Sequence, residues 1–280
     1  MSSMKIKVEY VYGKGVHKIN EDSYLIGKNI FGVFDGAGSL VNYTDKENHT
    51  GGYLASNICK NIFQNEKLNL YKLAIKANNG IQRQMKLNCI NMSKKENFWS
   101  TTVSVIKINQ KSKVFEWIQT GDSLIIVIYK NDKYKVLIKN YDHDSKTLFL
   151  KKELLISNNK DIRAKLLPQM LKVRRGMNKN YGVLNGDPSA IKFLKKSKLK
   201  IDNIKHILMF TDGLFLPKED PKLPDDFDRF VKMYLEGGLS KIKKFVRKLE
   251  NTDPDCYKYP RFKKHDDIAG ISVTFEDKNS

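Results

Sequence analysis

The chain has 280 residues, 40% of them hydrophobic and 10% aromatic, so it is long and apolar enough for a substantial core and is not a disordered chain. Its three cysteines match no metal-ligand spacing, which argues against a disulfide scaffold and against a zinc site. A formal net charge of +20 predicts attraction to anionic partners without selecting among them. No repeat or linker divides the sequence, and we expect a single domain over residues 1–280.

The N-terminal segment, residues 1–7, lacks an apolar signal core. The longest clear apolar run, Leu124–Tyr129, is far too short to span a bilayer. We therefore expect a cytoplasmic protein that does not cross a membrane.

The first part of the chain alternates between strand-like and helix-like patterns. Residues 5–12 are typical of an edge strand, and Ser23–Ile26 with Ile30–Phe34 predict a hairpin closed by a short turn. Apolar residues then recur at helical spacing over residues 51–62 and 70–85. This pattern predicts two helices that pair antiparallel and lie on a sheet.

Four strands follow, and the short turns between them predict a meander, hence an antiparallel sheet. These strands cover residues 101–108, 114–120, 125–129 and 134–138. Residues 140–181 carry a weaker, charged pattern with one helix, and we expect them to form an insertion over one edge of the core.

The last third of the chain completes an α+β pattern. It contains a buried strand at residues 206–210, helices at 225–237 and 239–249 separated by a Gly-Gly break, and a final strand at 268–275. Runs of strands with two separate helix pairs predict a sandwich in which antiparallel sheets face inward and helices cover the outside.

Acidic residues stand at the ends of apolar, strand-like runs five times in the chain. They are Glu21 with Asp22, Asp35, Asp122, Asp212, and Asp266 with Asp267. Aspartate is depleted in strands, and buried carboxylates need partners or a metal. A lone Asp-Gly is more often a plain turn, but the repetition favours a centre for a hard cation such as Mg²⁺ or Mn²⁺.

Basic clusters occur at residues 172–175, 192–200, 241–248 and 258–264. They are mostly lysine with little aromatic interleaving, and no helix-turn-helix, finger or RNA-binding signature accompanies them. A solvated lysine-rich surface is therefore the preferred interpretation over a dedicated nucleic-acid site, although an anionic partner stays open.

Five short motifs in the same order carry a resemblance to a known family. They are Asn20-Glu-Asp-Ser-Tyr24, Val33-Phe-Asp-Gly-Ala-Gly38, Thr120-Gly-Asp-Ser123, Phe210-Thr-Asp-Gly213 and His265-Asp-Asp-Ile268. With them the sequence resembles, over nearly its whole length, the metal-dependent Ser/Thr protein phosphatases of the PPM, or protein phosphatase 2C, family, particularly the bacterial members. Each motif alone is a weak signal, and five in register are a strong one.

The resemblance implies a four-layer α-β-β-α sandwich with a two-metal site in a cleft at one end of the sheets. Residues 140–181 would take the place of the family's variable flap beside this cleft. Carried over position by position, the catalytic and metal-binding residues are Asp35, which would bridge both ions, Gly36, which would offer its carbonyl, and Asp212 and Asp266, which would complete one ion's shell.

Three further acidic residues receive roles from the same resemblance. Asp122 matches the aspartate that binds a third ion in some members, and Glu21 and Asp22 would hold water molecules bound to the ions. The implied cofactors are two ions of Mn²⁺ or Mg²⁺. Two such ions can lower the pKa of a shared water and orient a phosphate ester for in-line attack, so no side-chain nucleophile is needed. The chain contains no Gly-x-Ser-x-Gly motif, in agreement with this chemistry.

The sequence departs from the family at the phosphate-binding position. His17 stands where members usually carry an arginine, four residues before the Glu-Asp pair. Because histidine is shorter and only partly protonated at pH 7, we expect His17 to bind phosphate weakly, or Lys14 or Lys18 to take its place. Ala37 stands where many eukaryotic members have a histidine proposed as general acid, which bacterial members often lack.

The function that the resemblance implies is hydrolysis of phosphoserine and phosphothreonine in phosphorylated proteins. One alternative is a catalytically weak or inactive phosphoprotein-binding regulatory module that kept the metal site. A less favoured one is a nucleic-acid-directed metal phosphoesterase, which the net charge of +20 suggests.

Overall fold

The computed structural model describes residues 5–139 and 143–276, and two five-stranded sheets form its centre. The first sheet contains, in spatial order, β1 (Lys5–Gly13), β12 (Ile268–Glu276), β11 (Ile204–Phe210), β8 (Leu124–Tyr129) and β9 (Tyr134–Val136). The second sheet contains β10 (Lys195–Lys200), β7 (Val114–Thr120), β6 (Val103–Asn109), β3 (Ile30–Phe34) and β2 (Ser23–Ile26). The short strands β4 (Gly36–Ala37) and β5 (Ser100–Thr101) pair with each other. Within the described residues all of these pairings are antiparallel.

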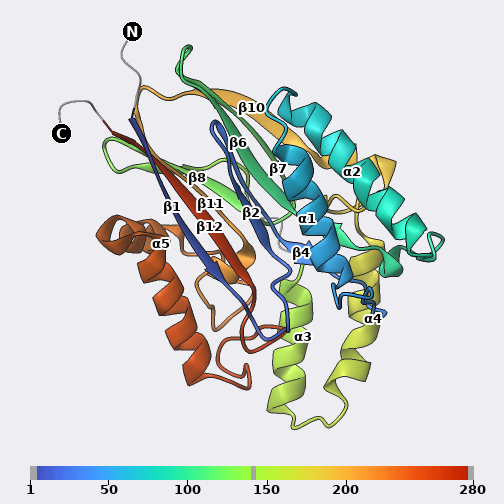
Figure 1. Ribbon diagram of the computed structural model, residues 1–280. Helices are drawn as coiled ribbons and strands as arrows, with labels where there is room; N and C mark the ends of the chain where they lie inside the picture. The colour runs from blue at the N-terminus through green and yellow to red at the C-terminus, as the bar shows by residue number, and fades with distance from the viewer. Residues whose placement is uncertain (1–4, 140–142, 277–280) are drawn as a thin grey trace.

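Helices cover the outer face of each sheet, so the predicted four-layer α-β-β-α sandwich is confirmed (Figure 1). Helices α1 (Gly51–Phe63) and α2 (Leu70–Leu87) lie on the second sheet, and α5 (Phe227–Thr252) lies on the first. Three apolar layers hold the four layers of structure together. They are the cluster under α1 and α2 (Phe63, Leu73, Ile81, Ile118), the cluster between the sheets (Phe31, Ile106, Ile207, Val273) and the cluster under α5 (Phe210, Phe230, Ile242). Each of these fully buried side chains contributes about 1.5–3 kcal/mol.

Local signals explain where the helices begin and where one of them bends. The side chain of Thr50 accepts a hydrogen bond from the Tyr53 amide at 3.2 Å and begins α1, and Asn69 does the same for α2. Helix α5 is interrupted at Gly237 and Gly238, as the sequence predicts. Gly238 has a φ of 66°, which a residue with a side chain rarely adopts.

The predicted four-strand meander is wrong, because its strands belong to two different sheets. Strands β6 and β7 pair in the second sheet, whereas β8 and β9 pair in the first. The chain crosses between the sheets at Gly121, whose φ is 78°. A short connection between two apolar runs is equally compatible with a hairpin and with such a crossing, so the local pattern could not distinguish them.

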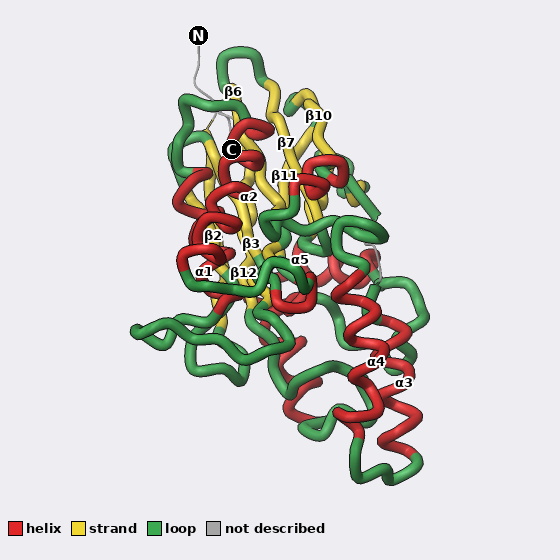
Figure 2. The backbone as a smooth tube through the Cα atoms, turned by 90° about the vertical axis from the view of Figure 1, so that its right-hand side faces the viewer, coloured by secondary structure: helices red, strands yellow, loops and turns green. Residues whose placement is uncertain are grey.

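The insertion contains two helices, α3 (Ser145–Ile156) and α4 (Ile162–Arg175), where the sequence predicts one. Both views show these two helices side by side and extending beyond one end of the sheets (Figure 2). Thr147 and Leu166 are their buried residues, so neither helix has the broad apolar face that makes helical spacing visible in a sequence. The first residues of the predicted insertion, 140–142, lie outside the described residues.

Strand β10 was missed because its sequence is mostly lysine. It is the edge strand of the second sheet, and its lysines are exposed. Lysine on an edge strand hinders pairing with another chain, which gives this part of the basic sequence a structural reason. Three short 3₁₀ helices complete the fold: η1 (Lys95–Asn97), η2 (Pro188–Phe193) and η3 (Asp212–Leu214). None of the helices in residues 5–139 and 143–276 has both the length and the apolarity that a bilayer span requires.

Candidate metal centre

Strand register brings the acidic residues of the sequence to the same end of both sheets. Phe210 at the end of β11 pairs with Leu124 at the start of β8 and with Gly270 near the start of β12. Asp212, Asp122 and Asp266 stand just beyond these residues, so they meet at one edge of the first sheet.

The second sheet contributes its acidic residues at the same end. Ser23 pairs with Phe34, so Asp22 and Asp35 stand next to each other where β2 begins and β3 ends. The carbonyl of Asp35 accepts a hydrogen bond from the amide of Thr102 at 2.9 Å, which fixes its backbone. The acidic residues of both sheets therefore come close together, although they are up to 244 positions apart, from Asp22 to Asp266, in the chain.

The charges of these residues act on one another. Burial raises the pKa of Asp35 well above its usual value, and the charges of Asp212 and Asp22 raise it further. The pKa of Asp212 is raised in the same way by burial and by Asp266 and Asp122, against a hydrogen bond with Asp35 that lowers it. Carboxylates held together away from water are unfavourable in the charged form, and a cation among them removes this cost.

Asp22 is the acidic residue whose surroundings a cation would fit best. It is 3% exposed, and its Oδ2 atom has no hydrogen-bond partner among the described residues. Burial raises its pKa well above the usual value, against a hydrogen bond with Thr211 that lowers it, and the charges of Asp266 and Asp212 add to the rise. An unsatisfied carboxylate oxygen in an all-oxygen donor set suits Mg²⁺ or Mn²⁺, so the residues present fit the ions that the family resemblance implies.

The acidic side chains lie near one another but do not surround a single point. Within the described residues, no group of three or more His, Cys, Asp or Glu side chains is arranged to hold a metal ion as it stands. Asp266 is paired instead with Lys263, whose Nζ lies 2.8 Å from Asp266 Oδ1. The convergence of the acidic residues therefore rests on strand register and on their mutual electrostatic effects.

Close backbone contacts require two glycines of the motifs. A side chain at Gly36 would overlap the carbonyl oxygens of Gly52 and Glu21, so Asp35-Gly36 can lie against the start of α1 because this residue has no Cβ. A side chain at Gly213 would overlap the carbonyl oxygen of Asp267. The second contact brings the loop after β11 against the segment before β12.

We expect Gly213→Ala to lower the free energy of unfolding by about 2 kcal/mol or more, because the added methyl group meets rigid backbone and must push two segments apart. Urea unfolding of the metal-free protein measures this change. Gly38→Ala is the matched control, because a Cβ there meets no atom closer than 3.7 Å. Equal stability of the two variants would contradict the tight contact.

Glu21 is held at the N-terminus of α1. Its Oε1 atom accepts a hydrogen bond from the hydroxyl of Thr50, and its carbonyl accepts one from Ser56 Oγ at 2.5 Å. Its amide donates to Asp267 Oδ2 at 2.9 Å. The carboxylate is thereby fixed beside Gly52, and the Glu21 carbonyl lies against Gly36 at the edge of the acidic cluster.

Asp267 has a role that sequence reasoning missed. Its side chain is buried and accepts hydrogen bonds from the amides of Gly15 at 2.7 Å and Glu21 at 2.9 Å. It therefore fastens the loop of residues 13–22 to the segment that carries Asp266. The acidic pair at 266–267 was visible in the sequence, but nothing local indicated that its second member binds backbone 246 residues away.

His17 lies in the exposed part of the same loop. Its neighbour Val16 donates to the carbonyl of His265 at 3.3 Å, which brings the loop over the acidic segment. The side chain of His17 is not part of the pocket at the metal centre. Lys14 and Lys18 are exposed as well, and Lys14 Nζ donates to the carbonyl of Lys18 at 3.3 Å.

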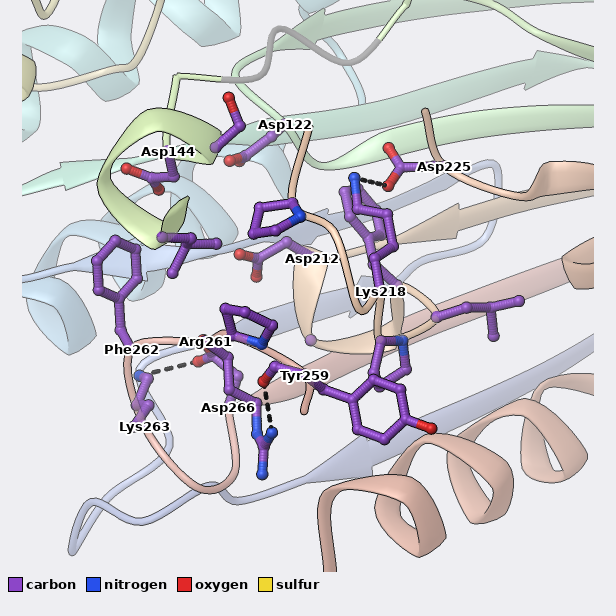
Figure 3. A pocket seen from close by; sticks show the side chains of 18 of the residues that line it. Asp122, Asp144, Asp212, Lys218, Asp225, Tyr259, Arg261, Phe262, Lys263 and Asp266 are labelled. Atoms are coloured by element: carbon purple, nitrogen blue, oxygen red, sulfur yellow. Dashed lines mark hydrogen bonds and ion pairs between the residues drawn. The ribbon is translucent and has the colours of Figure 1, made fainter. Parts of the chain in front are cut away.

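A pocket of about 180 Å³ opens at the acidic cluster, and Asp122, Asp212 and Asp266 line it (Figure 3). Its other walls come from the start of α3, the loop at residues 215–225 and the loop at residues 259–263. Asp35, Asp22 and Glu21 are not among its lining residues. The start of the segment predicted as an insertion thus borders the pocket.

His143 at the pocket wall was also missed. Its Nε2 atom lies 3.5 Å from Asp144 and 3.9 Å from Asp122, and its ring stacks on Tyr181 at 4.1 Å between centroids. The residue falls in the insertion, where no motif or periodicity marked it. It lies beside Asp122, the aspartate that the family resemblance associates with a third ion.

Comparisons with known proteins identify the family of the chain. A sequence model described as protein phosphatase 2C matches residues 18–249. A comparison with the sequences of curated proteins finds no significant match.

Solved structures of bacterial phosphatases are similar in fold. The catalytic domain of the serine/threonine phosphatase PstP in complex with two manganese ions aligns with a TM-score of 0.59 and 13% identity, covering 99% of this chain and 100% of that one. The Mycobacterium tuberculosis phosphatase PstP/Ppp gives 0.57 and 16%, covering 97% and 99%. Stp1 from Staphylococcus aureus gives 0.61 and 15%, covering 98% and 97%. These structural similarities establish the fold, and the match over residues 18–249 establishes the family: the chain belongs to the protein phosphatase 2C family.

Proposed function

We propose that this chain is a metal-dependent phosphoserine/phosphothreonine protein phosphatase that uses two ions of Mn²⁺ or Mg²⁺. The observation that supports the proposal is the meeting of Asp22, Asp35, Asp122, Asp212 and Asp266 at one end of the sheets, with a buried Asp22 oxygen that lacks a partner. Family membership supports the same reaction class.

In this proposal Asp35 would serve both ions, as the family resemblance implies, and the charges of Asp212 and Asp22 both act on it. Gly36 would offer its carbonyl, Asp212 and Asp266 would hold one ion, and Asp122 would hold a third. When bound, two divalent ions lower the pKa of a water and neutralise the phosphate's charge. Glu21 and Asp22 would orient water. Glu21 would do so from a fixed position, since Thr50 holds its side chain and Asp267 holds its backbone amide.

The substrate in this proposal is a phosphorylated protein, and its dephosphorylation would serve signalling in the cytoplasm. The pocket beside the carboxylates suits such a substrate, because apolar walls at Leu148, Phe215 and Phe262 adjoin its acidic end. Peptide bound along these walls would hold the phosphorylated side chain at Asp212 and Asp266.

The test is phosphate release from a phosphothreonine peptide. We expect release with Mn²⁺, none in excess chelator, and full recovery when Mn²⁺ is restored, because the attacking water has no other activator. Activity that persists in excess chelator would contradict the proposed mechanism.

A regulatory module that binds phosphoproteins without turnover is the second candidate, favoured by the exposed His17 at the usual arginine position. It predicts Mn²⁺-dependent binding of the phosphopeptide with no phosphate release. The same assay, combined with a binding measurement, therefore decides between the two functions.

A further inference from the structure

The substrate phosphate needs a cation in addition to the metal ions, and His17 is a weak candidate because it is exposed and outside the pocket. Three side chains with a permanent positive charge at pH 7 line the pocket among the described residues: Lys218, Arg261 and Lys263. Their hydrogen bonds show which of them has donors left for a ligand.

Arg261 has no donor left. Its Nε donates to the carbonyl of Lys264 at 3.0 Å, one terminal nitrogen donates to Asp253 Oδ2 at 2.9 Å and to the carbonyl of Tyr259, and the other donates to the carbonyls of Glu250 and Asp253. A guanidinium has five N–H groups, and all five are used. Arg261 therefore braces the loop and does not bind a ligand.

Lys218 uses two of its three N–H groups within its own loop. Its Nζ lies 2.9 Å from Asp225 Oδ1 and donates to the carbonyl of Leu223 at 2.9 Å. These bonds close the loop at residues 215–225 on itself. Breaking them for a phosphate would leave the partly buried Asp225 without this cation.

Lys263 differs from both, because its partner is a carboxylate of the metal centre. Its Nζ lies 2.8 Å from Asp266 Oδ1, and its side chain is 25% exposed (Figure 3). An ammonium has three N–H groups, and Asp266 takes one of them. Lysine is charged at neutral pH, because its ordinary pKa is about 10.4.

The loop that carries Lys263 is rigid on both sides. The carboxylate of Asp253 accepts hydrogen bonds from three amides, those of Tyr257, Lys258 and Tyr259, as well as from Arg261. A cation held on such a loop loses little entropy when it binds a ligand.

On the other side of Lys263, helix α5 holds His265 and Asp266. Arg247 donates to the carbonyl of Asp266 at 2.5 Å, and Glu250 Oε2 lies 2.9 Å from His265 Nδ1. The backbone is therefore held on both sides of Lys263. Its side chain extends toward the acidic cluster, where its charge also acts on Asp212.

We propose that Lys263 is the phosphate-binding cation of this site, in place of the arginine that the chain lacks at position 17. The inference rests on the proposed phosphatase function and names the residue that holds the phosphate monoester. A divalent ion bound to Asp266 would neutralise the charge of this carboxylate. The Lys263 ammonium would then lose Asp266 as its counter-ion, and the dianionic phosphate would replace it. Lysine acts here as a point charge, so it demands less exact orientation than arginine.

The experiment measures binding of inorganic phosphate to Mn²⁺-loaded protein by calorimetry, for wild type, Lys263→Met, Lys263→Arg and the control Lys264→Met. Lys264 is the exposed next residue, and the bond that its backbone accepts from Arg261 is kept in the control. We expect Lys263→Met to weaken phosphate binding at least about tenfold, because a hydrogen bond between charged groups is lost. Lys263→Arg should restore most of it, and Lys264→Met should not change it.

The dissociation constant for Mn²⁺ without phosphate is measured in parallel, because removal of an ammonium from Asp266 should leave it equal or tighter. Unchanged phosphate binding in Lys263→Met would overturn the proposal and leave Lys263 a counter-ion of Asp266. Weaker phosphate binding in His17→Ala, with no effect at Lys263, would overturn it in favour of His17. If Lys263→Met does not fold by circular dichroism, Lys263→Gln takes its place in the same comparison.

Failure of this inference and failure of the proposed function give different results. Protein that binds phosphate through Lys263 but releases none from phosphopeptides supports the role of Lys263 and contradicts the phosphatase. Protein that releases phosphate while Lys263→Met keeps its phosphate affinity and its Michaelis constant supports the phosphatase and overturns the role of Lys263.

Discussion

We expect Asp35→Asn to reduce Mn²⁺-dependent phosphate release by at least about 100-fold, more than any other substitution of an acidic residue in the chain. Loss of a residue that only orients a metal ligand typically costs 10–100-fold, and Asp35 is proposed to bind both ions directly. Asparagine keeps the shape of the side chain but brings no negative charge. Asp212→Asn and Asp266→Asn should follow in the size of their effects, since each is proposed to serve one ion.

The same substitution should stabilise the metal-free protein at pH 7. The pKa of Asp35 is raised by burial and by Asp212 and Asp22, which means that its charge costs stability in the folded state. Asp35→Asn removes this cost while it removes activity. A variant that is both less active and less stable than wild type, in the absence of metal, would contradict this electrostatic account.

Asp132→Asn is the matched control for both measurements. Asp132 is an exposed aspartate in the turn between β8 and β9, and it is paired with Lys205 at 3.1 Å at the surface. The substitution makes the same chemical change beyond the end of β8, whereas Asp122 of the acidic cluster precedes its start. Exposed pairs contribute little, so activity and stability should both stay close to wild type.

We expect saturating Mn²⁺ to raise the free energy of unfolding by about 5 kcal/mol, since each of two ions at 100 times its dissociation constant contributes about 2.7 kcal/mol. For a chain of this size this corresponds to a rise in Tm of roughly 10 °C. Differential scanning calorimetry with Mn²⁺ and with excess chelator measures the difference. Asp35→Asn is expected to lose most of the rise.

The stabilisation by Mn²⁺ should grow with pH. The pKa values of Asp22, Asp35 and Asp212 are raised in the folded, metal-free protein, so their cost is absent below the ordinary carboxyl pKa near 3.9 and increases as pH rises toward the folded values. Metal binding needs the deprotonated carboxylates, and it also strengthens over this range.

The difference in Tm with and without Mn²⁺ should therefore be small at pH 5 and larger at pH 8. His206 has the opposite effect on stability, both with and without Mn²⁺. Burial lowers its pKa to about 4, so the fold favours its neutral form and this contribution to stability rises with pH. Since Mn²⁺ does not act on His206, subtracting the two curves removes this effect. A difference that shrinks as pH rises would contradict the predicted coupling.

Most helices and strands could be predicted from the sequence because their signals are local. Apolar residues at helical spacing mark α2, and the Gly-Gly pair marks the break in α5, where Gly238 needs its φ of 66°. The elements that were missed lack such signals. Lysines occupy β10, and α3 buries little more than Thr147.

The acidic residues were visible for the same reason. Asp35 directly follows an apolar strand, Asp212 follows one after Thr211, and both precede a glycine. The order of the motifs along the chain is a property of the sequence alone. The sequence by itself therefore determined the family, the layer architecture and the set of carboxylates.

Only the tertiary structure decided what these residues contact. The carboxylate of Asp267 accepts hydrogen bonds from the amides of Gly15 and Glu21. Lys263 is paired with Asp266, whereas Arg261 uses every donor on its own loop and on the end of α5. A lysine-rich stretch in a sequence does not tell which lysine reaches a site, because burial and hydrogen-bond partners are set by segments that are distant in the chain. The local sequence likewise does not tell whether β8 forms a hairpin with β7 or crosses to the other sheet. The side chains of β8 are buried on both faces of the first sheet, and which sheet offers such burial is a property of the packed molecule.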